Sequence, residues 1–181
     1  MTESLYRSYW KIRRFKMKGA EFIALTWEKI DEMVRKITGK IRDSGFEPDI
    51  ILGVSKGGLI PAVLLSDKIG VDVDIIGVQY YKGIKETKER PEITQEVSTD
   101  LHGKRVLVID DVADTGHSLQ LVMNYVKEKG AEKIVTCTLH YKPWSAIKPD
   151  CYLKETEAWV IYPWEINEMS KSRQRNVRNT E

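Results

Sequence analysis

Three acidic residues, Asp110, Asp111 and Asp114, follow closely on the apolar segment 106–109. The segment is rich in β-branched residues, which is typical of a strand buried on both faces of a parallel sheet. The small residues of 113–118 then lead into a run whose apolar spacing predicts a helix. Backbone N–H groups at a helix N-terminus bind phosphate, and carboxylates suit ribose hydroxyls or Mg²⁺. Because ligands bind beyond the carboxyl ends of such strands, we expect a sugar-phosphate site here.

A second candidate binding loop follows the apolar segment 49–54 and consists of Ser55, Lys56, Gly57 and Gly58. The two glycines let the backbone approach a ligand closely, and the lysine supplies a positive charge. The helix predicted after this loop directs its positive N-terminal end at the same place. Taken alone, the loop is also compatible with an ordinary strand-to-helix turn.

Apolar periodicity predicts the elements that must position these loops. Strands are predicted at residues 20–25, 49–54, 71–80, 106–109 and 134–140. Helices are predicted at 27–41, from about 61 onward, and across 119–126. Thr26 provides an N-cap for the first helix, and Trp27 lies on its apolar face, so we expect Trp27 in the core.

The sequence also limits the class of protein. A chain of 181 residues fits a single domain. It contains no G-x-x-x-x-G-K-[ST] motif, and no G-x-G-x-x-G follows an apolar strand, which excludes the usual nucleotide-binding loops. The three histidines lack zinc-ligand spacing, and Cys137 and Cys151 lack a C-x-x-C spacing, which indicates a reducing compartment. Because there is no long apolar run and no secretory segment, we expect a cytoplasmic protein without membrane contact.

The two loops together resemble those of the type I phosphoribosyltransferases, whose motif for phosphoribosyl pyrophosphate (PRPP) is an apolar strand followed by acid-acid-x-x-Asp-Thr-Gly-x-Ser/Thr. The resemblance implies an α/β fold with a mostly parallel central sheet flanked by helices. A small hood would be built from the C-terminal segment and the strand near 20–25. The single domain would span 20–170, with the hood at about 143–166. Residues 1–19 would be a basic extension, disordered or helical, and 171–181 a basic disordered tail.

The resemblance also implies a role for each loop residue. The PRPP 5′-phosphate would be held by Ala113, Asp114, Thr115, Gly116, His117 and Ser118, and the ribose by Asp110 and Asp111. The pyrophosphate would be held by Ser55, Lys56, Gly57 and Gly58, with Arg90 as a further contact in the polar connection 81–104, which resembles the family's mobile hairpin. Asp114 matches the family's proton acceptor at purine N7 and is the predicted catalytic residue. Mg²⁺ is the expected cofactor, with Asp111 and Glu165 as candidate ligands. The peptide bond that is often cis in the family would be Ser55–Lys56.

Residues near the C-terminus indicate the acceptor. Lys142, after the strand at 134–140, resembles the lysine with which 6-oxopurine phosphoribosyltransferases hold the exocyclic oxygen of the base. The segment 158–165 is similar to the purine-binding hood of microbial xanthine/hypoxanthine-guanine enzymes, where Trp159 would stack on the purine and the Val160 backbone would contact its edge. The resemblance therefore implies purine salvage: hypoxanthine, guanine or xanthine and PRPP would give the nucleoside 5′-monophosphate and pyrophosphate. It also implies a homo-oligomer, a dimer or a tetramer.

Two alternatives stay open at this point. The chain could be a PRPP- or nucleotide-sensing regulatory protein whose basic ends contact nucleic acid, or a phosphoribosyltransferase for adenine, orotate or uracil. The net charge of +2 gives no general case for nucleic-acid binding, although residues 1–19 and 171–181 are basic. The basic N-terminal residues are also compatible with an organelle transit peptide, a solvated extension, or an upstream start codon with Met17 as the first residue.

Overall fold

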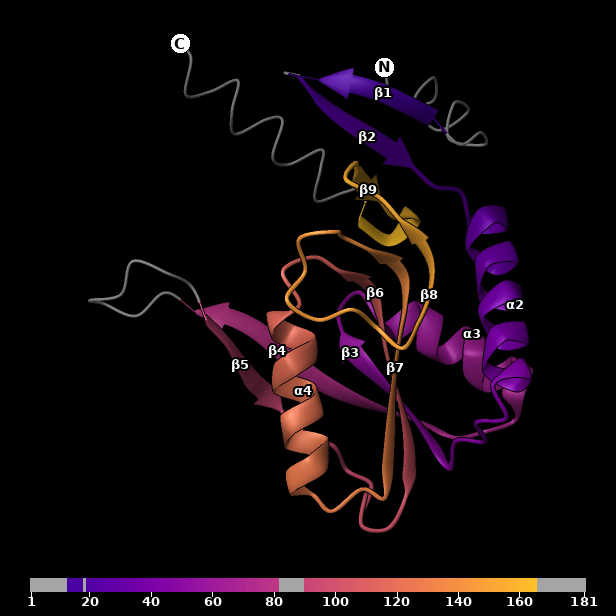
Figure 1. The fold of residues 1–181 in the computed structure, drawn as a ribbon, viewed down its shortest axis with the longest axis vertical. Coiled ribbons are helices and arrows are strands. Elements are labelled where there is room, and N and C mark those ends of the chain that lie inside the picture. The colour runs from indigo at the N-terminus through magenta and orange to yellow at the C-terminus, as the bar shows by residue number, and fades with distance from the viewer. Residues whose placement is uncertain (1–12, 18, 82–89, 166–181) are drawn as a thin grey trace. The chain divides into compact units, whose positions relative to one another are not determined.

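The computed structural model describes residues 13–17, 19–81 and 90–165 (Figure 1). The chain folds into two compact units. The larger unit comprises residues 32–156, and the smaller unit comprises the described residues before 32 and after 156. In the described part of the chain, no helix is both long enough and apolar enough to cross a membrane.

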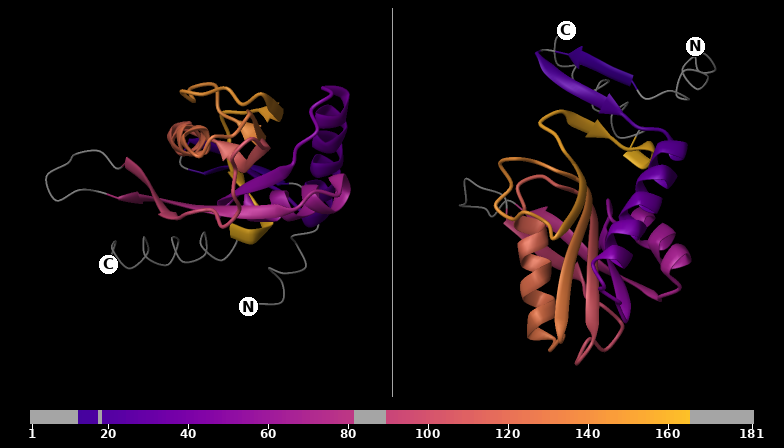
Figure 2. Two further views of the ribbon diagram at one scale, coloured as in Figure 1. Left: turned by 90° about the horizontal axis from the view of Figure 1, so that it is seen from below. Right: turned by 45° about the vertical axis from the view of Figure 1, so that its right-hand side comes forward.

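The larger unit is built around a sheet of six strands in the order β5-β4-β3-β6-β7-β8. The strands are β3 (Ile50–Ser55), β4 (Val73–Tyr81), β5 (Arg90–Gln95), β6 (Arg105–Ala113), β7 (Lys133–Tyr141) and β8 (Cys151–Glu155). All neighbouring pairs are parallel except β4 and β5, which are antiparallel. The hairpin of β4 and β5 projects beyond the other strands (Figure 2). The predicted mostly parallel sheet is therefore confirmed, and so is the hairpin, of which residues 82–89 lie outside the described residues.

Three helices connect or flank these strands: α2 (Trp27–Asp43), α3 (Leu59–Ile69) and α4 (His117–Glu128). The Thr26 hydroxyl accepts a hydrogen bond from the Lys29 N–H, which confirms the predicted N-cap of α2. Apolar side chains of α4 pack on one face of the sheet in a cluster with Leu52 and Val54. Gly53 points to the opposite face, where it lies against Ala62 of α3. The helices α3 and α4 therefore cover opposite faces.

The order of the strands places a topological switch point between β3 and β6. The chain passes from β3 through α3 to β4 on one side, and from β6 through α4 to β7 on the other. Right-handed crossovers in opposite directions put the two helices on opposite faces, so the loops that lead into them separate and leave a crevice. Both candidate binding loops lie at this point, at the carboxyl ends of adjacent parallel strands.

The smaller unit contains a sheet of three strands in the order β1-β2-β9. The strands are β1 (Arg13–Met17), β2 (Ala20–Ala24) and β9 (Trp159–Ile161), and a short 3₁₀ helix, η1 (Pro163–Glu165), follows β9. Pairing of β9 with β2 agrees with a hood formed from these two segments.

Three expectations about these regions are wrong. Residues 13–17 are neither helical nor disordered, because they pair with β2 as an antiparallel strand. The hood begins later than residue 143, because β8 joins the large sheet beside β7. Trp27 is 53% exposed rather than part of the core, and its ring lies 5.9 Å from that of Trp164. The other apolar residues of this helix face, such as Ile30 and Ile37, are fully buried as predicted.

The larger unit also brings the two cysteines together, which the sequence analysis did not foresee. Cys137 in β7 and Cys151 in β8 are direct partners in the parallel ladder, and both are free thiols.

Gly58, at the junction of β3 and α3, offers a test of how closely the two loops approach. A Cβ at this position would overlap the Ile109 carbonyl oxygen of β6 and lie 2.7 Å from the Val54 nitrogen. The Gly58 backbone is in the ordinary right-handed region, so the obstacle is steric alone. We expect Gly58→Ala to lower the free energy of unfolding by about 3 kcal/mol, measured by urea denaturation.

Gly39 in α2 is the matched control, because a Cβ there meets open space among the described residues. Gly39→Ala should raise the free energy of unfolding by about 0.5–1 kcal/mol, since alanine favours the helix. If Gly58→Ala were as stable as the unmodified protein, the close packing of β6 against this turn would be wrong.

Candidate functional site

The loop after β6 begins later than expected from the sequence. The strand was expected to end before the paired carboxylates, but it runs through Asp110 and Asp111 to Ala113. The reason is the neighbouring strand, since β6 keeps its pairing with β7 as far as Ala113 opposite Tyr141. A short turn follows, in which Gly116 has a φ of +81°, and α4 begins at the next residue. This turn aims the N-terminus of α4 at the space beyond the sheet.

The two adjacent carboxylates leave the strand on opposite faces. Asp110 lines a cavity on the α4 side of the sheet. Asp111 is buried, and its carboxyl group lies against the Cα of Gly57, so close that a Cβ there would overlap it. The side chain of Asp111 therefore joins the end of β6 to the second binding loop.

The second loop forms a tight turn between β3 and α3. The Ser55–Lys56 peptide bond is cis, as expected. The Gly58 N–H donates to the Val54 carbonyl at 2.8 Å, and the Leu59 N–H donates to the Lys56 carbonyl at 3.2 Å. Lys56 is exposed at this turn. The turn thus holds the Lys56 side chain, and Gly57 beside the buried Asp111 carboxylate, at the carboxyl ends of β3 and β6.

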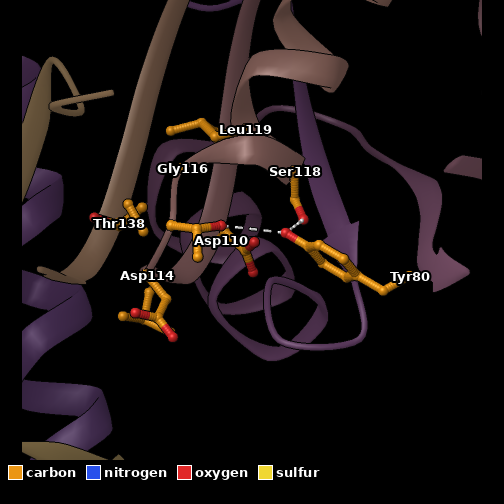
Figure 3. Close-up of a pocket in the computed structure, with 10 residues that line it drawn as sticks. Tyr80, Asp110, Asp114, Gly116, Ser118, Leu119 and Thr138 are labelled. Carbon is orange, nitrogen blue, oxygen red and sulfur yellow. Dashed lines mark hydrogen bonds between the residues drawn. The ribbon is translucent and has the colours of Figure 1, made fainter. Parts of the chain in front are cut away.

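A cavity of about 370 Å³ opens beside the loop after β6 (Figure 3). Its lining includes most of the residues predicted to hold the 5′-phosphate: Ala113, Asp114, Thr115, Gly116 and Ser118. His117, also predicted to hold the 5′-phosphate, does not line the cavity; its backbone N–H donates to Thr115 Oγ1 at 3.4 Å. Thr138 of β7, next to Asp110 in the ladder, also lines the cavity, and its buried hydroxyl has no hydrogen-bond partner among the described residues.

Tyr80, near the end of β4, reaches into the same cavity and was missed by the sequence analysis. Ser118 Oγ donates to Tyr80 Oη at 3.1 Å, and Tyr80 Oη lies 3.4 Å from Thr115 Oγ1 (Figure 3). The available signal was its position, since Tyr80 lies at the carboxyl end of a parallel strand, where the other candidate residues also lie.

Asp114 has a partner that the sequence analysis also missed. Trp144 Nε1 donates a hydrogen bond to Asp114 Oδ1 at 2.9 Å. The ammonium group of Lys142 lies 5.3 Å from the centre of the Trp144 ring, within the range of a cation–π interaction. Lys142 is itself almost fully buried, and its backbone N–H donates to the Ala113 carbonyl at 3.0 Å. The structure therefore brings Lys142 and Asp114 together through one tryptophan.

The remaining candidate residues belong to other elements. Trp159, which is 56% exposed, and Val160, which is buried, are in β9 of the smaller unit. Glu165 is also in that unit, where its Oε2 accepts from the Tyr162 N–H at 3.4 Å. Arg90 begins β5, pairs with Tyr81 and does not line the cavity. The roles of these four residues stay predictions.

Comparison with known proteins identifies the family. Residues 25–169 match the phosphoribosyl transferase domain, and the chain belongs to this family. The family and the α/β fold predicted from the two loops are therefore confirmed.

Individual relatives are consistent with this assignment. A xanthine-guanine phosphoribosyltransferase of Cereibacter sphaeroides is 26% identical over 153 residues, which cover 78% of this chain and 86% of that protein. The crystal structure of a purine phosphoribosyltransferase from Pyrococcus horikoshii is 41% identical, covers 79% of this chain and 93% of that chain, and has a TM-score of 0.72. The structure of a Neisseria gonorrhoeae protein with bound ppGpp is 25% identical, covers 87% of this chain and 97% of that chain, and has a TM-score of 0.73.

His140, two residues before Lys142, gives a test of the electrostatics of this strand. Burial, followed by the charges of Lys154 and Lys142, lowers the pKa of His140 from 6.5 to about 4. Between these values the unfolded chain binds a proton that the folded protein does not, so stability falls as the pH falls. We expect the free energy of unfolding to decrease by up to about 3 kcal/mol from pH 6.5 to pH 4 through this group.

The measurement is urea denaturation at a series of pH values, compared with the variant His140→Gln, which cannot take up the proton. The variant should lose less stability over this interval than the unmodified protein. Equal losses in the two proteins would show that His140 is not buried in its neutral form.

Proposed function

We propose that this chain transfers the 5-phosphoribosyl group of PRPP to a 6-oxopurine, giving the nucleoside 5′-monophosphate and pyrophosphate. The observation that carries the proposal is the meeting of two binding loops at the switch point of the sheet, where the Asp111 carboxyl group lies against Gly57. Relatives named xanthine-guanine and hypoxanthine phosphoribosyltransferase support a purine acceptor.

The two loops suit the two ends of PRPP. The cavity beside α4 offers backbone N–H groups and the Thr115 and Ser118 hydroxyls to the 5′-phosphate. The turn after β3 offers Lys56 and the backbone of two glycines to the pyrophosphate. Asp110 and Asp111 are the residues that we propose for binding the ribose hydroxyls. Nearby carboxylates also stabilise the positive charge that develops on the sugar as the pyrophosphate leaves.

Mg²⁺ is the cofactor that we propose. Among the described residues, no group of three or more His, Cys, Asp or Glu side chains could hold a metal by itself. Mg²⁺ is commonly held by one or two carboxylates together with substrate phosphates, and Asp111 beside the pyrophosphate loop fits that arrangement. Bound there, Mg²⁺ would neutralise charge on the leaving group. Glu165 as a second ligand stays a prediction.

A homo-oligomeric state and a cytoplasmic location also stay predictions.

Asp114 is the proposed general base at N7 of the purine. Asp114 is one of the residues that line the cavity, and its carboxylate accepts a hydrogen bond from Trp144 Nε1. Lys142, whose ammonium group lies over the same tryptophan ring, would donate to the oxygen at C6. An ammonium group is only a donor, so it favours the C6 oxygen of a 6-oxopurine over the amino group of adenine. Contacts of Trp159 and Val160 with the purine stay predictions.

A second candidate function is PRPP or nucleotide sensing without catalysis. The similar Neisseria gonorrhoeae protein has ppGpp bound in its structure, which favours nucleotide binding as such. A sensor has no need for both a leaving-group loop and an oriented general base. Because this chain has candidates for both, we favour the enzyme.

The proposal is tested by measuring pyrophosphate release from PRPP with guanine, hypoxanthine, xanthine and adenine in parallel. We expect release with at least one 6-oxopurine, none without a base, and a fall to background when EDTA removes Mg²⁺. PRPP binding without release for any base would favour the sensor. A preference for adenine would contradict the role of Lys142.

The role of Asp114 is tested by two variants that differ in severity. Asp114→Ala removes the base and should lower kcat by a factor on the order of 10² while the KM for PRPP changes little. Trp144→Phe keeps the carboxylate but removes its Nε1 donor, so kcat should fall by a smaller factor, roughly 3–10.

Tyr125→Phe is the control, since it also removes an aromatic donor to a carboxylate, that of Glu96 at 3.1 Å, and Tyr125 does not line the cavity. Its kcat should match that of the unmodified enzyme. An unchanged kcat in Asp114→Ala would remove Asp114 from the reaction, and an unchanged kcat in Trp144→Phe would remove Trp144 as its positioning residue.

A further inference from the structure

Three hydroxyl groups from two distant parts of the chain meet in the cavity beside α4. Tyr80 comes from the end of β4, whereas Thr115 and Ser118 come from the loop and helix that follow β6. The Tyr80 hydroxyl lies 3.1 Å from Ser118 Oγ and 3.4 Å from Thr115 Oγ1. Figure 3 shows the Tyr80 side chain pointing toward Ser118, with a dashed line joining their hydroxyl groups.

These contacts contribute little to the stability of the fold. The Tyr80 side chain is 44% exposed, so its hydroxyl could be hydrogen-bonded by water instead. A hydrogen bond that replaces one to water adds little net free energy. The fold therefore gains little from these contacts, and the three hydroxyl groups are available to a ligand that enters the cavity.

The chemistry of the three groups indicates an anionic ligand. Each hydroxyl can rotate to donate a hydrogen bond, and hydrogen bonds to a charged acceptor are stronger than those between neutral groups. The N-terminus of α4 adds a positive dipole end at the same point. A phosphate dianion is the acceptor that can use several such donors at once.

We propose that Tyr80 is a further binding residue for the 5′-phosphate of PRPP, donating from its phenol hydroxyl alongside Thr115 and Ser118. The inference rests on the proposed function for the identity of the ligand. Tyr80 then links the end of β4 to the phosphate, although β3 separates β4 from β6 in the sheet. It also favours ribose that carries a 5′-phosphate over ribose that lacks it.

The opposite role is that Tyr80 blocks the cavity by holding the Thr115 and Ser118 hydroxyls. The two roles differ in the sign of one measurement. If Tyr80 binds the phosphate, removing its hydroxyl weakens binding. If Tyr80 competes with the phosphate, removing its hydroxyl strengthens binding.

The experiment compares the full-length protein with Tyr80→Phe, which removes only the hydroxyl. Calorimetric titrations use PRPP, ribose 5-phosphate and pyrophosphate as separate probes. We expect the Kd for PRPP and for ribose 5-phosphate to rise about tenfold and the Kd for pyrophosphate to stay unchanged. In turnover assays, the KM for PRPP should rise similarly while kcat and the KM for the purine change little. The thermal midpoint should shift by no more than about 1 °C.

Tyr125→Phe is the matched control. Its hydroxyl donates to Glu96 at 3.1 Å, and neither residue lines the cavity, so the same chemical change should leave the three Kd values unchanged. An unchanged or lower Kd for ribose 5-phosphate in Tyr80→Phe would overturn the proposal. A rise confined to pyrophosphate would also overturn it, because Tyr80 would then act at the other end of PRPP.

Failure of the proposed function gives a different result. If the unmodified protein bound PRPP without turnover, the enzyme assignment would fail, but the Kd values would still test Tyr80. If it bound neither PRPP nor ribose 5-phosphate, titration with inorganic phosphate would decide: binding weakened by Tyr80→Phe supports the residue's role, and absent or unchanged binding overturns it.

Discussion

The close approach of the β3–α3 turn to the end of β6 is the constraint on which the site depends. At Gly58 the Ile109 carbonyl oxygen of β6 leaves no room for a methyl group, and at Gly57 the Asp111 carboxyl group occupies the corresponding space. Both contacts need glycine, because any side chain would push the turn away from the strand. The parallel pairing of β3 and β6 fixes the spacing of the two loops. The spacing of the two loops that we propose for the two ends of PRPP is thus set mainly by the backbone.

Around this fixed pair of loops, neighbouring strand ends supply further side chains to the site. Tyr80 lies near the end of β4, and Lys142 and Trp144 lie in the segment after β7. That segment is joined to residues 113–115, at the end of β6 and in the loop after it, by backbone hydrogen bonds: the Lys142 N–H donates to the Ala113 carbonyl, and the Ala146 N–H donates to the Thr115 carbonyl at 2.9 Å. A shift of residues 113–115 would therefore also displace the backbone at Lys142.

The sequence predicts well what local patterns determine. The strand before Asp110 and the two glycine-containing loops are recognisable because buried parallel strands, helix N-termini and phosphate loops leave contiguous signals. The end of β6 was misplaced, since two aspartates do not look like strand residues; pairing with β7 overrides that propensity. The antiparallel strand at residues 13–17 was missed for the same reason, because its pairing with β2 depends on a partner and not on an apolar pattern.

Contacts between side chains that are far apart in the sequence are harder to predict. Trp144 and Asp114 are 30 residues apart, and Tyr80 and Thr115 are 35 apart, so no spacing rule connects them. Their contacts follow from the register of strands and from the reach of long aromatic side chains. The Trp144 contact has a chemical consequence: one indole ring orients the Asp114 carboxylate with its N–H while its face lies near the Lys142 ammonium. In the proposed reaction the carboxylate accepts the purine's proton and the ammonium recognises its C6 oxygen, so the choice of base and the proton transfer would depend on the same side chain. A substitution at Trp144 would then alter both specificity and rate, whereas one at Lys142 would act mainly on specificity.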